Sequence, residues 1–574
     1  MHTTTTHFDK LHPIINTLFK KRGFGKEEQK EFLSWDLKNL PNLTHMKDMD
    51  KAAERILLSV EKNQTIGIYG DYDVDGTTSC ALFWQFFKSI GHKNIILIQP
   101  SRFVEGYGLH KSSIDDAKRQ GIDLLVTVDC GITNNEAALY SKEQDIDLII
   151  TDHHTDANEQ MPEAFAVINP NRRDEPEDSP LKPLAGVGVA FCLCLQVKNL
   201  MESEGKKCPS LYPLLEYVAI GTICDLATLT PLNLKLVRHG LKKVKDSSYF
   251  GLRAFFTPEE RSRSIIPSEK LSFQIGPLIN SKGRLDHPEK ALKLLISENS
   301  EDALSYYAHL HECNSERKKI TAEVFNQAKQ QVLDQIDGEE HIISIVYQKD
   351  WHEGVIGIVA SRLVETFKVP AIVFSNAEEN GIIKASARSA GPLNLFDCLK
   401  RNSDLFIKFG GHKAAAGLSM KRENLDLLRK NLTDDLKTLA PIERTLLDQF
   451  DLEIDITQIN FDLLSQLDLL EPFGMGNEKP LFRCVGLKLE SFDILKELHV
   501  RWNFCSSKGR PLRFKGISFN YVGKWGVLSP DQIFDLQNAK DSDLAVYCNL
   551  SINRFNGKES IQLMVDKITL GPLD

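Results

Sequence analysis

No stretch of this 574-residue chain approaches the ~20 consecutive apolar residues that a membrane-spanning helix requires. Its first residues also lack the basic and then apolar layout of a secretory signal. The eleven cysteines form no CxxC pair, which argues against thiolate zinc sites and against a disulfide framework. We therefore expect a cytoplasmic protein with reduced thiols and no membrane contact.

An excess of positive charge is missing as well. Lysine and arginine total 70 against 79 aspartates and glutamates, which gives a formal net charge of −9. This balance excludes a protein that coats nucleic acid through its overall charge, although a basic channel can exist locally on an acidic protein. Hydrophobic residues make up 42% of the chain, as in ordinary globular domains. The length suggests three or four domains of about 150 residues.

The chain does contain three apolar runs that each end in acidic residues or histidines. Residues 65–69 lead into Gly-Asp-Tyr-Asp-Val-Asp-Gly, residues 124–128 into Asp129, and residues 147–150 into Thr-Asp-His-His-Thr. If these runs are neighbouring parallel strands, their polar side chains meet at the edge where open α/β sheets place their chemistry. Carboxylates gathered in this way repel one another unless cations neutralise them. The sequence therefore predicts a metal site that includes Asp71, Asp73, Asp75, Asp129, Asp152, His153 and His154.

Each of these pieces is weak evidence when it stands alone. An Asp-x-Asp pair is typical of a solvated turn, Asp129 at a strand end is typical of a helix N-cap, and adjacent histidines can simply cap or pack. The succession of three such strand ends favours a metal site over these structural roles.

The segment 65–225 alternates between apolar runs and helix-like stretches. This alternation predicts βαβ units, and hence an α/β fold with a parallel sheet and helices on both faces. The expected strands are 65–69, 94–99, 123–128 and 147–150, and the expected helices are 77–90, 112–120, 135–145, 187–201, 211–224 and 231–244. Residues 161–183 are rich in proline and charge, which predicts a long surface loop.

The rest of the chain changes character twice. Residues 288–335 are polar and helical, which predicts a long connecting helix. A second α/β unit follows, with strands at 342–346, 371–374 and 382–387. From residue 445 onward, alternating segments and the turn Phe555-Asn556-Gly557-Lys558 predict an antiparallel β domain. An OB-type barrel fits this pattern, which does not by itself separate an OB fold from another small barrel.

Several motifs resemble those of a known family. The segments 70–76, 128–131 and 152–154 resemble the first three motifs of the DHH phosphoesterases. Further segments narrow the resemblance to the RecJ family of bacterial exonucleases that degrade single-stranded DNA from the 5′ end. They lie at 100–109, 184–188, 219–225, 276–286, 351–363, 409–417 and 472–477, in the family's order over nearly the whole chain.

The resemblance implies a division into four parts. These are a DHH catalytic domain with an N-terminal helical extension at 1–288, a long connecting helix at 289–339, a DHH-associated α/β domain at 340–444, and an OB-like nucleic-acid-binding domain at 445–574. In the last part, Phe514, Phe519, Tyr521 and Phe555 fit either a barrel core or stacking on bases.

The chemistry of phosphodiester hydrolysis agrees with this resemblance. Two divalent ions about 3.5–4 Å apart can activate water, neutralise phosphate oxygens and stabilise the leaving oxygen. Carboxylates suit Mg²⁺ and Mn²⁺, and imidazole shifts the preference toward Mn²⁺. The expected ligands are Asp71, Asp73, Asp75, Asp129, His153 and Asp225, with Asp129 as the bridge. Asp225 alone would be interpreted as a helix cap, and only the resemblance makes it a ligand.

The roles of two neighbouring residues stay open at this point. Asp152 is either a ligand or a group that orients an imidazole. By resemblance His154 faces the phosphate as a proton donor or charge stabiliser, although a buried structural histidine is the alternative. The chain also departs from the family where Asn233-Leu234 replaces the usual Asn-Arg, so no role is assigned there.

Other residues match the family's phosphate contacts. Arg102 and Arg284 are expected to bind phosphate, because the arginine fork matches phosphate oxygens in pairs. Backbone N–H groups at Gly410, Gly411 and His412 can approach a phosphate closely. Ser386 and Arg388 resemble the pocket for the DNA 5′ end. For any one of these arginines, the alternative to phosphate binding is an ordinary ion pair on the protein surface.

The resemblance implies a metal-dependent 5′→3′ exonuclease that releases 5′-mononucleotides from single-stranded DNA in recombination and repair. Single-strand-binding protein and a helicase are the expected protein partners, and the chain is expected to be a monomer. An alternative keeps the chemistry but restricts the substrate to short oligonucleotides or cyclic dinucleotides, for which residues 445–574 would be unnecessary. A non-catalytic DNA-binding scaffold is a third hypothesis, against which the intact acidic cluster argues.

Overall fold

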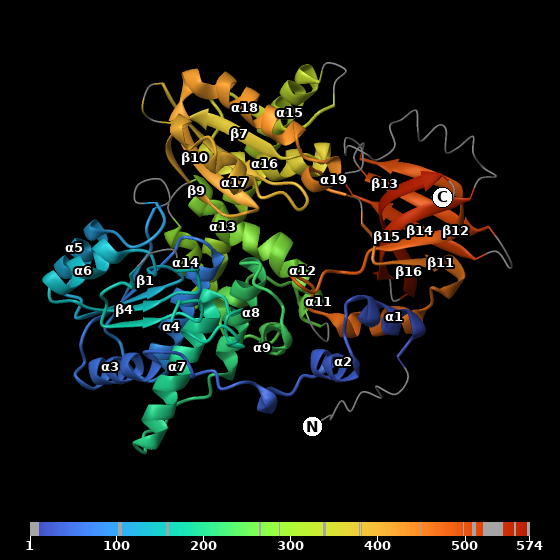
Figure 1. The fold of residues 1–574 in the computed structure, drawn as a ribbon. Helices are drawn as coiled ribbons and strands as arrows, with labels where there is room; N and C mark the ends of the chain where they lie inside the picture. Colours follow the sequence, from blue (N-terminus) through green and yellow to red (C-terminus); the bar gives the residue numbers. More distant parts are fainter. Residues whose placement is uncertain are drawn as a thin grey trace. The chain divides into compact units, whose positions relative to one another are not determined.

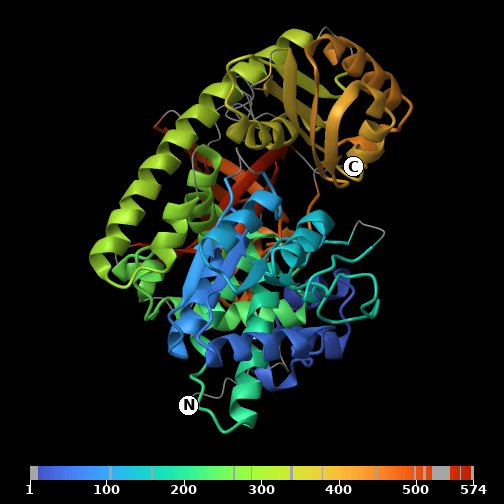
Figure 2. The ribbon, with the colours of Figure 1, turned by 90° about the vertical axis from the view of Figure 1, so that its left-hand side faces the viewer.

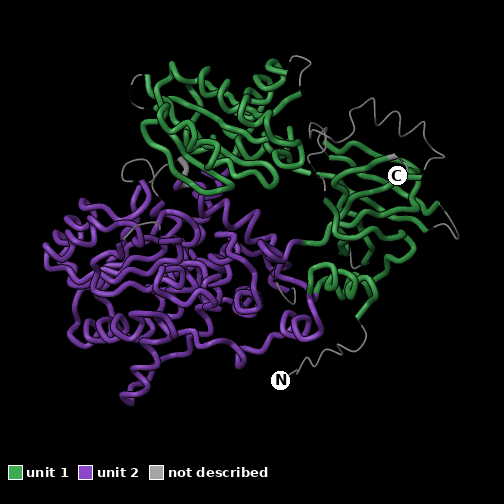
Figure 3. Tube along the Cα trace, in the orientation of Figure 1, with its two compact units in different colours: residues 1–23, 316–468, 479–574 green, residues 24–315, 469–478 purple. Residues whose placement is uncertain are grey.

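The computed structural model describes residues 11–101, 106–156, 160–262, 266–285, 288–336, 340–377, 379, 381–447, 449–496, 499–507, 512–519, 543–555 and 558–570. The chain forms two compact units (Figure 3). Unit 1 comprises Met1–Gly23, Glu316–Asp468 and Lys479–Asp574, and unit 2 comprises Phe24–Ser315 and Leu469–Glu478. Each unit is described by itself.

Unit 2 is built on a five-stranded sheet in the order β2-β1-β3-β4-β5. The strands are β1 (Ile66–Gly70), β2 (Ile95–Ile98), β3 (Leu124–Val128), β4 (Asp147–Thr151) and β5 (Ala166–Ile168). All four pairings are parallel, and the register aligns Gly70 with Val128 and Val128 with Thr151. The prediction of a parallel α/β sheet is confirmed, and the carboxyl ends of β1, β3 and β4 lie level with one another.

Helices cover both faces of this sheet (Figure 1). On one face α5 (Lys111–Arg119) and α6 (Asn135–Glu143) share a core with Tyr69, Leu125 and Ile150. The other face is covered by α3 (Met49–Glu61), α4 (Val74–Ser89) and α7 (Gly186–Ser203). Helix α4 is apolar nearly all round and most of its residues are buried, as expected of a central helix.

The expected surface loop at 161–183 is wrong for three residues. Ala166, Val167 and Ile168 form β5, which is buried and pairs with β4. A strand this short carries too little periodicity to stand out among the surrounding prolines and charges. Only its pairing with β4 defines it.

Unit 2 contains further helices, which follow or precede those on the sheet in the sequence. They are α2 (Lys26–Leu33), α8 (Leu215–Cys224), α9 (Pro231–Val244), α10 (Phe250–Arg253), α11 (Pro258–Arg261), α12 (Ser268–Lys270), the π-helical turn η4 (Leu271–Ile275), α13 (Gly276–Leu285) and α14 (Glu289–Leu295).

The expected single helix at 288–335 is wrong in one respect. The chain forms α14, leaves the helical path at 296–299, and then forms α15 (Ser300–Gln335), the long helix seen in Figure 2. Asn299 starts the second helix, because its Oδ1 accepts a hydrogen bond from the Asp302 N–H at 2.9 Å.

Unit 1 contains a mixed five-stranded sheet in the order β6-β7-β8-β10-β9. Its strands are β6 (Ser344–Tyr347), β7 (Ala371–Asn376), β8 (Ile382–Arg388), β9 (Phe406–Gly411) and β10 (Ala415–Lys421), and its helices include α1 (Pro13–Lys21), α16 (Glu353–Phe367), α17 (Leu395–Lys400), α18 (Leu425–Lys437) and α19 (Pro441–Arg444). The pattern analysis predicted β6, β7 and β8 but no strand at β9 or β10.

Unit 1 also contains a closed β-barrel. Its strands β11 (Leu452–Asp455), β12 (Phe482–Leu495), β13 (His499–Ser506), β14 (Arg513–Ser518), β16 (Lys558–Leu570) and β15 (Leu544–Phe555) form a sheet in that order, and β15 pairs back onto β12. The expected hairpin is confirmed, since Phe555 pairs with Lys558. The expected antiparallel character is wrong for β11–β12 and β14–β16, which pair in parallel.

Two further expectations concern cysteines and membranes. All eleven cysteine thiols are free, and Cys192 and Cys194 are buried in α7 as expected of helix core. Among the described residues, no helix combines the length and apolar character needed to cross a bilayer.

Candidate metal centre

The loop that follows β1 supplies three carboxylates in two steps. Asp71 comes directly after the strand and is buried, and the Asp73 side chain caps α4 by accepting from the Gly76 N–H at 3.1 Å. Asp75 lies in the first turn of α4 and is completely buried. A side chain at Gly76 would lie 2.4 Å from the Asp71 carbonyl oxygen, so glycine is needed for the helix start to pack this closely on the loop.

The ends of β3, β4 and α8 supply the other candidate ligands. Asp129 follows β3 with a left-handed backbone (φ 60°) and is 2% exposed. Such a conformation costs free energy for a residue other than glycine, and it is found mainly at functional sites. His153 follows β4, and Asp225 forms the C-cap of α8, which confirms its expected place at a helix end.

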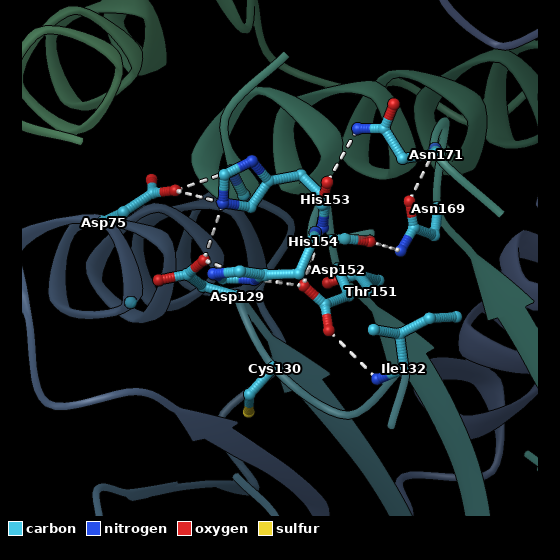
Figure 4. A network of polar contacts seen from close by, with 12 residues as sticks. Asp75, Asp129, Cys130, Ile132, Thr151, Asp152, His153, His154, Asn169 and Asn171 are labelled. Atoms are coloured by element: carbon cyan, nitrogen blue, oxygen red, sulfur yellow. Dashed lines mark hydrogen bonds and ion pairs between the residues drawn. The ribbon is translucent and has the colours of Figure 1, made fainter. Parts of the chain in front are cut away.

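The structure brings all six expected ligands together, and Figure 4 shows three of them, Asp75, Asp129 and His153. His153 Nε2 lies 3.1 Å from Asp129 Oδ1, 3.7 Å from Asp225 Oδ2 and 3.8 Å from Asp75 Oδ2. Three overlapping groups each have ligand atoms within 4.8 Å of one another: Asp71, Asp73 and Asp129; Asp75, His153 and Asp225; Asp129, His153 and His154.

The donor atoms at the centre fit a cation. Asp129 Oδ1 and His153 Nε2 are buried, and neither atom has a hydrogen bond. Buried polar atoms are normally satisfied, and a metal ion satisfies both an oxygen and an imidazole nitrogen. Carboxylates with one imidazole are a donor set for Mn²⁺ or Mg²⁺ rather than for a thiolate-bound metal.

Without cations, burial and mutual repulsion favour the protonated forms of Asp75, Asp129 and Asp225. Burial, and then repulsion from Asp73, raises the pKa of Asp75 to about 7. Burial and repulsion from Asp75 and Asp73 raise the pKa of Asp225 to about 9. The pKa of Asp129 is raised well above its usual value, again by burial first and then by Asp75. Positive charge at the centre would reverse these effects.

The N-terminus of α7 holds Asp75 in place. Asp75 Oδ2 accepts from the Gly186 N–H at 2.6 Å, and Oδ1 accepts from the Val187 N–H at 2.9 Å. These two hydrogen bonds, aligned with the helix dipole, favour the ionised form against the effect of burial. The carboxylate orientation is therefore fixed before a cation arrives.

Asp152 orients the two histidines and lies outside the three candidate ligand groups. Its Oδ1 accepts from the His153 N–H at 2.7 Å and the His154 N–H at 3.0 Å, and lies 2.8 Å from His154 Nδ1. Its Oδ2 accepts from the Ile132 N–H at 2.9 Å. Both oxygens are occupied in this way, which is the arrangement of a residue that supports ligands rather than binds the ion.

The two histidines have opposite protonation as a result. Burial, and then the neighbouring cationic His154, lowers the pKa of His153 to about 4, so its imidazole is neutral as a metal ligand requires. Burial opposes the charge on His154, but the hydrogen bond with Asp152 prevails and raises the pKa of His154 to about 9. His154 is therefore a cation at neutral pH.

Pattern reasoning missed the role of Tyr107. Its hydroxyl lies 3.1 Å from His154 Nδ1 and 3.5 Å from the Asp129 carbonyl oxygen. The signal for it was present in the Glu-Gly-Tyr-Gly motif, but the sequence does not show that this motif reaches the histidines. The tyrosine is 43% exposed and so also faces the solvent that a substrate would displace.

The other expected phosphate contacts lie in unit 1. Arg388 Nη1 donates to Ser386 Oγ at 2.9 Å on β8, and a side chain at Gly357 would meet that Oγ at 3.0 Å, so α16 packs directly on both residues. Gly410 and Gly411 end β9, which is joined to β8 through β10, and His412 follows with an exposed side chain. Four of these residues therefore belong to one sheet, and His412 follows its edge strand β9. Arg102 and the side chain of Arg284 lie outside the described residues.

Two of the remaining sequence observations are also resolved. Leu234, at the position where the family usually has arginine, is completely buried, and Asn233 donates to the carbonyl oxygens of Pro183 and Thr228. This position is therefore core. In the barrel, Phe514 is buried and Phe519 is 54% exposed, whereas Tyr521 and the side chain of Phe555 lie outside the described residues.

Comparison with known proteins agrees with this geometry. The chain matches the DHH family N-terminal domain over residues 65–222, the DHHA1 domain over 339–438 and the RecJ OB domain over 450–567. It is 31% identical to the single-stranded-DNA-specific exonuclease RecJ of Salmonella typhimurium over 97% of this chain and 96% of that protein. The chain belongs to the RecJ family. The RecJ of Bacillus subtilis is 32% identical over 97% of this chain and 68% of its own length.

Solved RecJ structures share the fold. The crystal structure of Thermus thermophilus RecJ in complex with Mn²⁺ aligns with a TM-score of 0.76 at 26% identity, over 97% of this chain and 76% of that chain. The complex of the same protein with Mg²⁺ aligns with a TM-score of 0.72. The resemblance to the RecJ family, the α/β fold with a parallel sheet and the OB assignment of the barrel are confirmed.

Proposed function

We propose that this chain is a metal-dependent exonuclease that degrades single-stranded DNA from the 5′ end, releases 5′-mononucleotides, and acts in DNA recombination and repair. The observation that carries this proposal is the cluster of six ligands from four segments in a member of the RecJ family. Relatives that are named single-stranded-DNA-specific exonucleases support the choice of substrate.

Two divalent ions, Mn²⁺ or Mg²⁺, would be held by the three overlapping ligand groups. Asp71 and Asp73 would serve one ion, Asp75, His153 and Asp225 the other, and Asp129 both, since it recurs in more than one group. When bound, such a pair supplies an activated water and neutralises the phosphate. Asp152 would not bind an ion but would hold the His154 imidazole and the backbone of His153 in the required orientation.

His154 is the protein's own charged group at this edge. As a cation hydrogen-bonded to Asp152, it would stabilise negative charge on the phosphate or donate a proton to the leaving oxygen. Tyr107 would keep the ring in position through its hydroxyl.

Binding of the strand would use residues of both units. Arg102 and Arg284 would contact phosphates near the cut, and Ser386 with Arg388 would bind the 5′ end, together with the backbone at Gly410, Gly411 and His412. The OB barrel would bind the strand farther from the cut. We propose domain boundaries at residues 288, 339 and 444, a monomeric state, a cytoplasmic location, and single-strand-binding protein and a helicase as partners.

The test uses DNA labelled at either end, single-stranded or duplex, incubated with Mn²⁺, Mg²⁺ or EDTA. We expect mononucleotides from the 5′ end of single strands only, and no cleavage in EDTA. A chain that cuts oligonucleotides of a few residues or cyclic dinucleotides but leaves long strands intact would instead have the restricted substrate range of other DHH phosphodiesterases.

A further inference from the structure

An aromatic side chain is exposed, without a structural reason, on a turn that packs against the helix ending in Asp225. Phe273 is 74% exposed, the largest exposed fraction among the large apolar side chains that the structure describes. It lies in the π-helical turn η4, between Leu271 and Ile275, which are both buried. These two neighbours anchor the turn, so the Phe273 ring adds nothing to the core. π-helical turns of this kind are frequent at functional sites.

The turn η4 is hydrogen-bonded to α8, the helix that ends in Asp225. The Cys224 thiol donates to the Leu271 carbonyl oxygen at 3.5 Å, and Cys224 immediately precedes Asp225. Helix α13, which continues from η4, passes the other ligand loop: a side chain at Gly283 would lie 3.3 Å from the Tyr72 carbonyl oxygen, between Asp71 and Asp73. The segment that presents Phe273 therefore spans two of the ligand-bearing segments.

Two other segments packed at the same helix end also present apolar side chains to solvent. Leu226 follows Asp225 with a left-handed backbone (φ 62°) and is 59% exposed. Met475 is 49% exposed, and its carbonyl oxygen accepts from the Leu229 N–H at 2.8 Å. Exposed apolar side chains on segments that pack around the end of α8, which carries Asp225, indicate a ligand with an apolar face.

We propose that Phe273 stacks on a base of the single-stranded DNA next to the scissile phosphate, with Leu226 and Met475 beside it. This rests on the proposed exonuclease function. A single strand bound through its phosphate at the metals carries bases within reach of the surrounding side chains. Stacking on an aromatic ring does not depend on base identity, because every base has a π-face. Phe273 would thus fix the position of the nucleotide without selecting its sequence.

The test measures binding of the full-length chain to a 5′-phosphorylated oligo(dT) of ten nucleotides in Ca²⁺, by fluorescence anisotropy. A second set of oligonucleotides carries one abasic residue, moved along the strand. We expect Phe273→Ala to weaken binding about ten-fold, as for the loss of one stacked base. Removal of one particular base should weaken wild-type binding equally and have no further effect on Phe273→Ala.

Controls separate stacking from general apolar contact and from misfolding. Phe273→Trp should bind as wild type, and Phe273→Leu should behave as Phe273→Ala. Leu304→Ala is the matched control: it removes another exposed apolar side chain, 59% exposed on α15, for which no contact with DNA is proposed, so binding should not change. Wild-type affinity in Phe273→Ala, or the same loss on every abasic strand, would overturn the proposal and indicate that another protein surface covers the ring. Cleavage by the wild type in Mn²⁺ is scored separately, so failure of the exonuclease function is distinguishable.

Discussion

At the scale of single residues, the centre is a set of carboxylates packed closely enough to raise one another's pKa values. Among the described residues, His154 is a cationic neighbour, and Asp152 already engages it. The metal-free protein therefore retains protons on Asp75, Asp129 and Asp225 that the unfolded chain would release. Binding of divalent ions must displace those protons, so metal affinity rises with pH.

This predicts a pH-dependent stability for the metal-free protein. Asp75 has a pKa of about 7 in the fold against 3.8 for the unperturbed group, so its contribution is fully present below pH 3.8 and lost as pH rises through 7. In EDTA, the Tm should fall between pH 6 and pH 8, and Mn²⁺ should raise it more at pH 8. Thermal melts check this, with Asp75→Asn as the variant that should lose part of the dependence. A Tm in EDTA that increases with pH would contradict it.

A second residue-scale prediction concerns Asp129. Asp129→Ala should abolish hydrolysis, because the carboxylate is grouped with Asp71 and Asp73 and also lies 3.1 Å from His153, a proposed ligand of the other ion. The same change should raise the Tm in EDTA, since it removes one of several mutually repelling carboxylates. Cleavage assays at saturating Mn²⁺ and melts in EDTA measure the two effects. Turnover close to wild type would remove Asp129 from the site.

At the scale of elements, the parallel pairing of β1, β3 and β4 is the reason that part of the candidate site could be predicted from the sequence. The ligands after β1, β3 and β4 were predictable because each follows an apolar run and the parallel register makes the strand ends level. Strand β9 was missed because Phe-Ile-Lys-Phe-Gly-Gly shows no alternation, and β10 was missed because the alternation in Ala-Ala-Gly-Leu-Ser-Met-Lys is carried partly by small residues of low strand propensity. Their pairing with β8 is non-local, so it shows only in the folded chain.

The difference between local patterns and non-local contacts also explains which residues of the candidate site could be predicted. Asp225 has the local pattern of a helix cap, and its proposed role as a ligand rests on the family resemblance and on its distance to His153. Tyr107 was missed for the same reason, since it is distant in sequence from His154. Contacts between segments that no local pattern connects cannot be read from spacing.

The sheet of unit 1 supports a prediction about the 5′ end. Arg388→Ala should weaken binding of 5′-phosphorylated strands by about 1.5–3 kcal/mol, the cost of a lost charge-assisted hydrogen-bonded contact. The effect on 5′-hydroxyl strands should be smaller. Affinities for the two strand types measure this, with Arg401→Ala as control because Arg401 already pairs with Asp435. Equal losses on both strands would argue against a 5′-phosphate pocket.

At the scale of the whole molecule, the barrel region cannot be removed without removing part of unit 2. Removal of residues 445–574 also removes Leu469–Glu478, which belongs to unit 2. The Ser268 hydroxyl donates to the Phe473 carbonyl oxygen at 2.8 Å, and Arg238 Nε donates to the Glu471 carbonyl oxygen at 2.8 Å. A truncated chain is therefore expected to melt at lower temperature, so it is a poor test of the barrel.

Charge reversal on the barrel surface is the cleaner experiment. Arg513 and Lys515 are exposed on β14, and the double change Arg513→Glu, Lys515→Glu should weaken binding of long single strands and lower its salt dependence. Cleavage of very short oligonucleotides should stay unchanged. Binding across a salt series measures the effect. An unchanged salt slope would favour protein docking over DNA binding by this face.

The membership of Leu469–Glu478 in unit 2 also has a consequence for synthesis of the chain on the ribosome. Arg238 is completely buried, and one of its acceptors, the Glu471 carbonyl oxygen, lies more than two hundred residues later in the sequence. Until that segment emerges, the nascent catalytic unit has an incomplete core. The catalytic unit thus completes its core only after the sheet of β6 to β10 has been translated in full and the barrel has begun to emerge.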